Sequence, residues 1–186
     1  MIADLLPIET ERLRLRFFVP EDAAAVHAIE SREDVTRWLY WPPRSEDEVR
    51  AVLARKIARA RDAPETGVAF AVELKAGGAL VGYADVSLGE PEHRGGEIGF
   101  VFHPDHQGRG YATEAAEALL ALAFDVYGLH RVEARAEARN VASVRVLEKL
   151  GMRLEGRLVE NEWVKGEWQS EAVYGLLARE WRARKG

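Results

Sequence analysis

The sequence contains no cysteine. This absence excludes disulfide bonds and any covalent intermediate on a protein thiol. No apolar run approaches the roughly 20 residues that a membrane-spanning helix needs. The first residues, MIADLLPIET, lack the basic region and the long apolar stretch of a signal peptide. We therefore expect a cytoplasmic protein without a membrane partner.

Dense runs of lysine and arginine are also missing. The chain has 26 Lys and Arg residues against 31 Asp and Glu residues, which gives a formal net charge of -5. This balance gives little electrostatic support to nucleic-acid binding, whereas it suits a basic substrate. His103 and His106 are separated by Pro104, and no cysteine or acidic set completes a metal-binding pattern. We expect neither a nucleic-acid partner nor a bound metal.

The remaining composition is that of a globular chain of ordinary size. Hydrophobic residues make up 47% of its 186 residues, and we find no repeat, low-complexity segment or long linker. We therefore expect one domain over residues 1–186.

Local patterns predict the order of helices and strands. Apolar residues alternate with arginines over 12–18, Ser45 and Glu48 form a capping box, and Gly77-Gly78 suits a hairpin turn. The predicted strands are 12–18, 68–75, 80–88, 94–103, 131–136, 152–164 and 168–177, and the predicted helices are 20–32, the segment after Ser45, 111–127 and a short helix from Asn140 to Gly151. This order predicts a mixed α/β domain around a central sheet.

One segment predicts a binding site for a pyrophosphate. Gln107-Gly108-Arg109-Gly110-Tyr111-Ala112 follows a predicted strand and opens a predicted helix. A helix N-terminus leaves backbone N–H groups without partners, and glycines let the backbone approach a ligand closely. An ordinary strand-to-helix connection is one alternative. A dinucleotide-binding turn is another, but it needs a third glycine where this chain has Thr113.

These residues, together with several others, resemble the GNAT superfamily of N-acyltransferases, and within it the RimJ/RimL-type N-acetyltransferases. The resemblance rests on Glu9-Thr10-Glu11-Arg12-Leu13, Trp38-Leu39-Tyr40-Trp41-Pro42, Glu97-Ile98-Gly99-Phe100, the 107–112 loop, Asn140-Val141-Ala142-Ser143 and Leu150-Gly151-Met152. It implies a GNAT fold: a central, mostly antiparallel, twisted sheet of about seven strands with flanking helices, splayed at the cofactor site. It also implies acetyl-CoA as the co-substrate.

The resemblance assigns cofactor-binding residues. The pyrophosphate would bind to the backbone from Gln107 through Gly108, Arg109, Gly110, Tyr111 and Ala112 to Thr113, and the pantetheine arm to the backbone of Phe100, Val101, Phe102 and His103. Asn140 would contact the pantetheine, and Ser143 would lie near the thioester sulfur as a proton donor. Asn140 with Ser143 also suits a plain helix N-cap, and the two roles are compatible. The Arg109 side chain suits either a phosphate contact or solvent.

The general base is open between two carboxylates. Glu162 matches a glutamate that acts as base through water in RimL-like enzymes, and it is the first choice. Glu97 shares a strand face with Gly99 and Val101 and is the second choice. Either could instead be an exposed strand carboxylate.

The aromatic cluster Trp38, Tyr40 and Trp41 also has two interpretations. These side chains could line an acceptor pocket and exclude water, or they could pack over the helices.

The identity of the acceptor is predicted from the resemblance and from the free energy needed to deprotonate the attacking amine. An α-amine has a pKa of about 7.7–8.0, and a lysine amine about 10.4, so neutralisation at pH 7 costs about 1 and about 4.6 kcal/mol. We therefore expect direct attack by a protein N-terminal α-amine in a ternary complex. A small amine, such as an antibiotic, polyamine or amino acid, is the first alternative, and a non-catalytic acyl-CoA-binding module is the second. A homodimer through the last strands is also expected.

Overall fold

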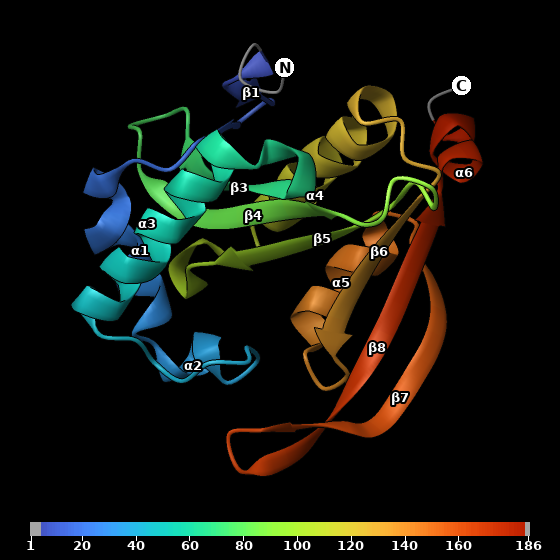
Figure 1. The fold of residues 1–186 in the computed structure, drawn as a ribbon. Helices are drawn as coiled ribbons and strands as arrows, with labels where there is room; N and C mark the ends of the chain where they lie inside the picture. The colour runs from blue at the N-terminus through green and yellow to red at the C-terminus, as the bar shows by residue number, and fades with distance from the viewer. Residues whose placement is uncertain (1–4, 185–186) are drawn as a thin grey trace.

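The computed structural model describes residues 5–184. A single eight-stranded sheet, in the order β1-β2-β3-β4-β5-β6-β8-β7, forms its centre (Figure 1). Neighbouring strands pair antiparallel except for β5 and β6, which are parallel. The strands are β1 (Ile8–Glu9), β2 (Leu13–Arg16), β3 (Gly67–Leu74), β4 (Leu80–Leu88), β5 (Gly95–Phe102), β6 (Arg131–Glu137), β7 (Arg153–Val164) and β8 (Glu167–Leu177).

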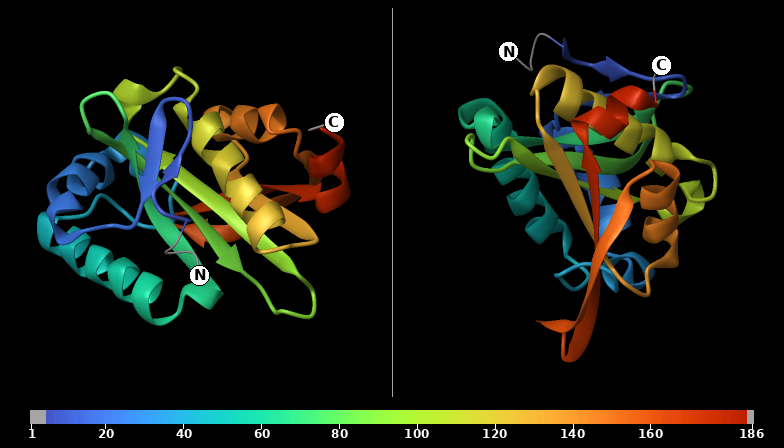
Figure 2. Two further views of the ribbon diagram at one scale, coloured as in Figure 1. Left: turned by 90° about the horizontal axis from the view of Figure 1, so that it is seen from above. Right: turned by 90° about the vertical axis from the view of Figure 1, so that its right-hand side faces the viewer.

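Helices cover both faces of the sheet (Figure 2). α1 and α3 lie over the face of β3 and β4 that carries Ala71 and Tyr83, with buried residues such as Val49 and Leu53 of α3. α4 lies on the opposite face, where Leu119 and its buried neighbours join the larger core. The helices are α1 (Ala23–Glu30), α2 (Glu33–Thr36), α3 (Glu46–Asp62), α4 (Tyr111–Ala121), α5 (Val141–Lys149) and α6 (Ala178–Ala183).

The predicted mixed α/β fold is confirmed. Ser45 and Glu48 form the expected capping box at the start of α3. Gly77 and Gly78 take φ values of +87° and +69° in the turn between β3 and β4, a region that favours glycine.

Some expected boundaries differ from the structure. The predicted helix 20–32 begins as a 3₁₀ turn, Pro20–Asp22, before α1, and the last turn of the predicted helix 111–127 is π-helical over Leu122–Val126. β1, α2 and α6 are not predicted from the sequence. They have two, four and six residues, too few to show a clear period. The sheet therefore has one strand more than the expected seven.

The sheet divides between β5 and β6. These strands pair over only three positions, from Gly95 with Arg131 to Glu97 with Glu133. Beyond this point the half made of β6, β8 and β7 diverges from the half made of β1 to β5 (Figure 1). The expected splay of the sheet is thus present, and within the described part of the chain it leaves one edge of β5 unpaired from Ile98 onward. Over residues 5–184, no helix combines the length and apolar character needed to cross a membrane.

Candidate active site

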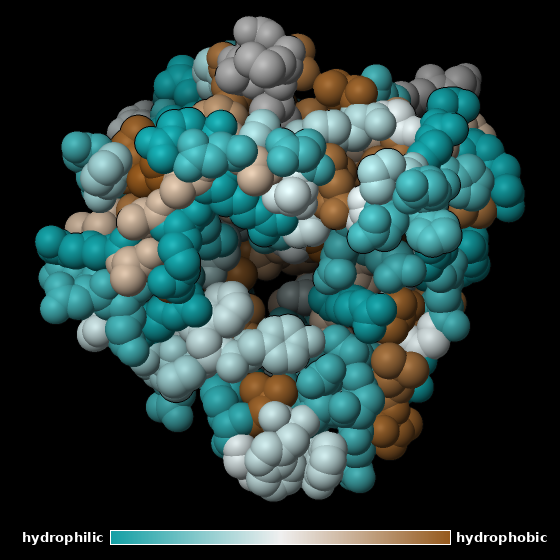
Figure 3. Space-filling view, viewed as in Figure 1, coloured by the Kyte–Doolittle hydropathy of each residue, from teal (hydrophilic) through white to brown (hydrophobic). Residues whose placement is uncertain are grey.

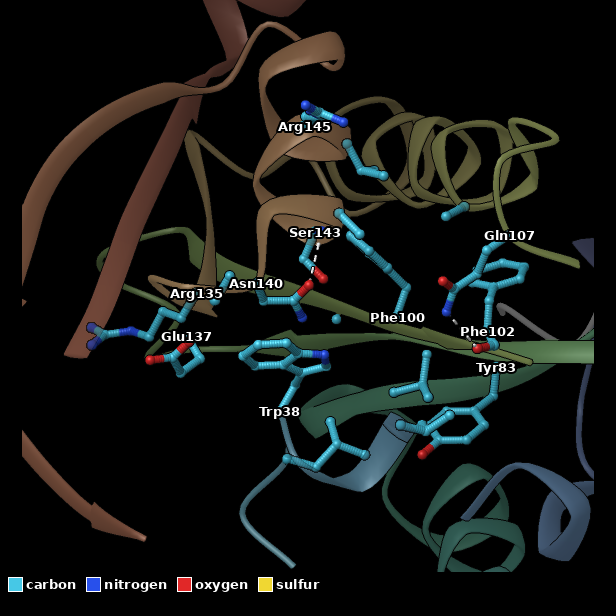
Figure 4. A pocket seen from close by; sticks show the side chains of 18 of the residues that line it. Trp38, Tyr83, Phe100, Phe102, Gln107, Arg135, Glu137, Asn140, Ser143 and Arg145 are labelled. Atoms are coloured by element: carbon cyan, nitrogen blue, oxygen red, sulfur yellow. Dashed lines mark hydrogen bonds between the residues drawn. The ribbon is translucent and has the colours of Figure 1, made fainter. Parts of the chain in front are cut away.

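A cavity of about 730 Å³ opens where β5 and β6 separate. Its walls come from the loop after α2, from β4 and β5, from the start of α4, and from α5, β7 and β8. Figure 3 shows a hollow near the middle of this face of the molecule, and Figure 4 shows side chains of the lining. Most of the predicted site residues line it: Trp38, Tyr40, Trp41, Glu97, Phe100, Val101, Phe102, Gln107, Gly108, Gly110, Tyr111, Ala112, Thr113, Asn140, Ser143 and Glu162.

The predicted pyrophosphate loop forms one end of this cavity. Gly108 and Gly110 have φ values of +72° and +84°, and Gly110 is the N-cap of α4. Among residues 5–184, the backbone N–H groups from Gly108 to Thr113 have no hydrogen-bond acceptor. These donors and the positive end of the helix dipole suit an anion at this position.

Two cations that the sequence analysis did not identify lie on the same side. Arg145 and Lys149 of α5 both line the cavity, and both are exposed. They are one helical turn apart, so they share a face of α5. Figure 4 shows Arg145 on the outer turn of α5, away from the sheet. The signal in the sequence was their spacing after Asn140, but basic residues at that spacing are common on solvated helices.

Asn140 and Ser143 lie between the two ends of the cavity. The Asn140 Oδ1 atom accepts a hydrogen bond from the Ser143 N–H at 3.2 Å, which is the N-cap of α5 (Figure 4). The capping role predicted from the sequence is therefore confirmed. Both residues also line the cavity, so the geometry permits the ligand contacts that the resemblance implies.

His103 and Arg109 do not line the cavity, unlike the other predicted cofactor residues. The His103 N–H donates to the Val81 carbonyl at 2.9 Å, and its Nδ1 accepts from the Asp105 N–H at 3.2 Å. This N–H is therefore already used inside the protein. The Arg109 side chain is exposed, and its backbone carbonyl accepts a hydrogen bond from Arg12 at 2.9 Å.

The predicted aromatic residues surround the other end. Trp38 and Trp41 are half-buried, with the guanidinium groups of Arg37 and Arg44 over their rings at 4.4 Å and 4.3 Å. The Tyr40 hydroxyl reaches across the cavity and donates to Glu171 of β8 at 2.8 Å. This bond joins the loop after α2 to the second half of the sheet.

Carboxylates gather at this aromatic end. Glu97, Glu162, Asp85 and Glu171 all line the cavity there. Glu97 is open to the cavity, but the surrounding walls displace water and thereby raise its pKa. The charge of Arg135 lowers this pKa in part, and the charge of Asp85 raises it further. Glu97 therefore holds a proton more readily than an ordinary glutamate does.

Asp85, Lys56 and Glu171 were missed in the sequence analysis. Asp85 pairs in register with Gly99, and a Cβ at Gly99 would lie 3.1 Å from the Asp85 Oδ1 atom. Glu171 accepts from Tyr40 and from the Asn161 amide, the latter at 2.7 Å. The only available signal for Asp85 was a single charge in the otherwise uncharged strand LVGYADVSL. Nothing in the sequence connects Asp85 with Lys56.

Asp85→Asn is expected to stabilise the protein at neutral pH. Burial raises the Asp85 pKa, and Lys56 and Arg59 offset this effect only in part. The folded chain then binds the proton more tightly than the unfolded chain, so the free energy of unfolding falls as the pH rises through the folded-state pKa. Melting temperatures of the two proteins should differ by a few degrees at pH 8 and converge below the ordinary aspartate pKa of about 3.9.

Asp34→Asn is the matched control for this prediction. Asp34 lines the same cavity, but its pKa is lowered by hydrogen bonds from Arg32, so its loss should not raise the melting temperature. If the melting temperatures of wild type and Asp85→Asn changed with pH in parallel, the proposed burial of an incompletely neutralised charge would be contradicted.

Among residues 5–184, no group of three or more acidic, histidine or cysteine residues has the arrangement of a metal site.

Comparison with known proteins agrees with this geometry. Residues 12–153 match the acetyltransferase (GNAT) domain family. The chain is 33% identical over 174 residues to the uncharacterized N-acetyltransferase YnaD of Bacillus subtilis (strain 168), covering 94% of this chain and 98% of that protein. It is 27% identical over 159 residues to the spermidine N(1)-acetyltransferase of Vibrio cholerae, covering 85% and 88%.

A solved structure extends the comparison to the whole fold. The GNAT-family acetyltransferase from Bacillus anthracis superposes with a TM-score of 0.84 at 34% identity, covering 93% of this chain and 99% of that one. The chain belongs to the GNAT family of acetyltransferases, and it is an N-acyltransferase that depends on acetyl-CoA.

Proposed function

We propose that this enzyme acetylates a primary amine of a small cationic molecule. The observation that carries the proposal is the division of charge within the cavity. Lys149 of α5 shares a groove with Gly110 and Thr113 of the loop end, and Arg145 lies one turn before it. At the other end four carboxylates, Asp85, Glu97, Glu162 and Glu171, outnumber the two cations Lys56 and Arg135. A cavity wall with an excess of one charge raises the local concentration of ligands of the opposite charge. Such an arrangement suits a polyanionic donor at one end and a cationic acceptor at the other.

Two contacts link opposite sides of the acceptor end, and Tyr40 and Glu171 of the first one line the cavity. The Tyr40 hydroxyl binds Glu171 at 2.8 Å, and the Lys165 Nζ atom donates to the Thr36 carbonyl at 2.5 Å. Both join the segment around α2 to the hairpin of β7 and β8. An acidic end bridged in this way favours a slender amine over the end of a folded chain.

The cofactor fits the residues at the loop end. The N–H groups from Gly108 to Thr113, which have no acceptor within the described residues, would hold its pyrophosphate, with Arg145 and Lys149 near its phosphates. The unpaired edge of β5 at Phe100 and Val101 would hold the pantetheine arm as an added strand does. Acetyl-CoA supplies the thioester whose acetyl group is transferred.

The acceptor must lose a proton before it attacks. Glu97 is proposed as the base, directly or through one water, because its raised pKa brings it closer to the operating pH. Glu162, the first choice from the sequence, lines the same end and is the alternative base in this proposal. The Ser143 hydroxyl is proposed to protonate the departing sulfur, whose ordinary pKa of about 8.5 makes this a modest demand.

A protein N-terminal α-amine is the second candidate acceptor. Its pKa of about 7.7–8.0 makes deprotonation about 3.6 kcal/mol less costly than that of a lysine-like amine. The open mouth of the cavity in Figure 3 favours this candidate, because an extended N-terminus could enter there.

Acceptor kinetics distinguish these candidates. With acetyl-CoA saturating, we expect a linear diamine to be acetylated with a kcat/KM at least about tenfold above a monoamine of equal length, because a second ammonium adds roughly one charged contact. The advantage should shrink as salt is raised. A peptide with a free N-terminus that exceeds the diamine would overturn the small-amine proposal and favour the α-amine.

A further inference from the structure

The N-terminal segment Glu9-Thr10-Glu11-Arg12-Leu13 contacts the start of α4. The Thr10 hydroxyl and the Arg12 N–H both donate to Glu114 Oε1, at 2.5 Å and 2.8 Å. The Arg12 guanidinium binds the second carboxylate oxygen of Glu114: its Nε and Nη2 atoms each lie 2.7 Å from Oε2. Glu114 is only 15% exposed, and both of its carboxylate oxygens accept hydrogen bonds from this segment.

The third nitrogen of the Arg12 guanidinium, Nη1, contacts the pyrophosphate loop. Its Nη1 atom donates to the Arg109 carbonyl at 2.9 Å, and its guanidinium also lies over the Tyr111 ring at 4.8 Å. Arg12 does not line the main cavity, but it lines a separate groove on the outer side of the loop. Gly110 lines both. The loop therefore lies between Arg12 and the cavity.

This contact bears on the direction of an N–H group. In a trans peptide the carbonyl and the following N–H point in opposite directions. Because the Arg109 carbonyl faces Arg12, the Gly110 N–H faces away from Arg12. A flipped peptide would present an oxygen to the phosphates in place of a donor. Glycine permits such a flip, since it adopts either sign of φ at little cost, and here φ is +84°.

We propose that Arg12, fixed by Glu114, is a positioning residue that holds the Arg109–Gly110 peptide with its N–H toward the pyrophosphate of coenzyme A. Its charge is matched by Glu114, so it acts by orientation more than by attraction. Lysine cannot reproduce the role, because its single nitrogen cannot occupy the separate positions of Nε and Nη2 at Glu114 and of Nη1 at the Arg109 carbonyl. The N-terminal motif, which takes no part in the acyl transfer itself, thereby acts on the cofactor loop.

Calorimetric titration of coenzyme A tests the proposal. Arg12→Met should raise the dissociation constant by about 10-fold to 100-fold, and Arg12→Lys by less, because an oriented hydrogen bond to a charged ligand is lost or weakened. Thr10→Ala is the matched control. It weakens the same N-terminal attachment but keeps the contact between Arg12 and Arg109, so affinity should stay within about twofold.

Kinetics separate positioning from general destabilisation. Arg12→Met should raise the KM for acetyl-CoA and leave kcat nearly unchanged. Transfer from S-acetylpantetheine, which lacks the pyrophosphate, should not change. Wild-type affinity in Arg12→Met, or equal loss of affinity in Thr10→Ala, would overturn the proposal. If Arg12→Met does not fold, Arg12→Lys with wild-type affinity would overturn it equally.

Discussion

Gly110→Glu is expected to abolish detectable binding of coenzyme A, a loss of at least about 100-fold or 2.7 kcal/mol. Gly110 is the N-cap of α4, in the left-handed region with φ of +84°, and its neighbouring N–H groups have no acceptor among residues 5–184. A glutamate there places a negative charge at the position proposed for the pyrophosphate. Its carboxylate would also compete with the ligand for the positive end of the helix dipole. Titration calorimetry measures the loss.

Two variants separate this effect from backbone strain. Gly110→Ala carries the cost of a side chain at positive φ, about 1–2 kcal/mol, but no charge. Its Cβ would lie 3.3 Å from the Arg12 Nη2 atom, so we expect weakened but measurable binding. Gly78→Glu introduces the same residue at a similar φ in the hairpin of β3 and β4, with nothing within 4 Å, and should bind normally. Retained binding in Gly110→Glu would contradict the location of the pyrophosphate loop.

Glu97→Gln is expected to reduce kcat by about 100-fold or more, within the range of general base catalysis. Burial raises the pKa of Glu97, so the acid limb of the wild-type pH profile should lie above the ordinary glutamate range. Below that pKa the base is protonated and activity falls; above it activity is retained. In Glu97→Gln this limb should disappear. Steady-state kinetics across pH, with both substrates saturating, measure both effects.

Glu162→Gln and Glu133→Gln are the comparison variants. Glu162 lines the cavity and is the alternative base, so its loss should cost less than about fivefold if Glu97 acts. Glu133 pairs with Glu97 in register but does not line the cavity, so its loss should have little effect. A large loss in Glu162→Gln with a minor one in Glu97→Gln would transfer the role to Glu162.

Features that depend on a few adjacent residues could be predicted from the sequence. The capping box of Ser45 and Glu48 and the Asn140 cap each involve residues three positions apart, and both are present. The glycine turn at Gly77-Gly78 likewise requires only its own backbone conformation. Such features are fixed by local sterics and hydrogen bonding, so the chain displays them without reference to its fold.

Features that depend on distant contacts could not be predicted. Tyr40 and Glu171 are 131 positions apart, and Arg12 and Glu114 are 102 apart. Asp85 and Lys56 come from different elements, and only the folded sheet brings them to one cavity. A charged residue in a sequence gives no indication of its partner across the sheet. The acidic character of the acceptor end therefore emerged from the structure alone.

Titration calorimetry of the wild-type protein with acetyl-CoA tests the account most directly. We predict saturable binding at one site per chain, with no comparable binding of NAD or ATP. At 100 times the dissociation constant, acetyl-CoA should also stabilise the fold by about 2.7 kcal/mol, which a thermal shift detects. Binding of NAD or ATP without binding of acetyl-CoA would contradict the cofactor site described between β5 and β6.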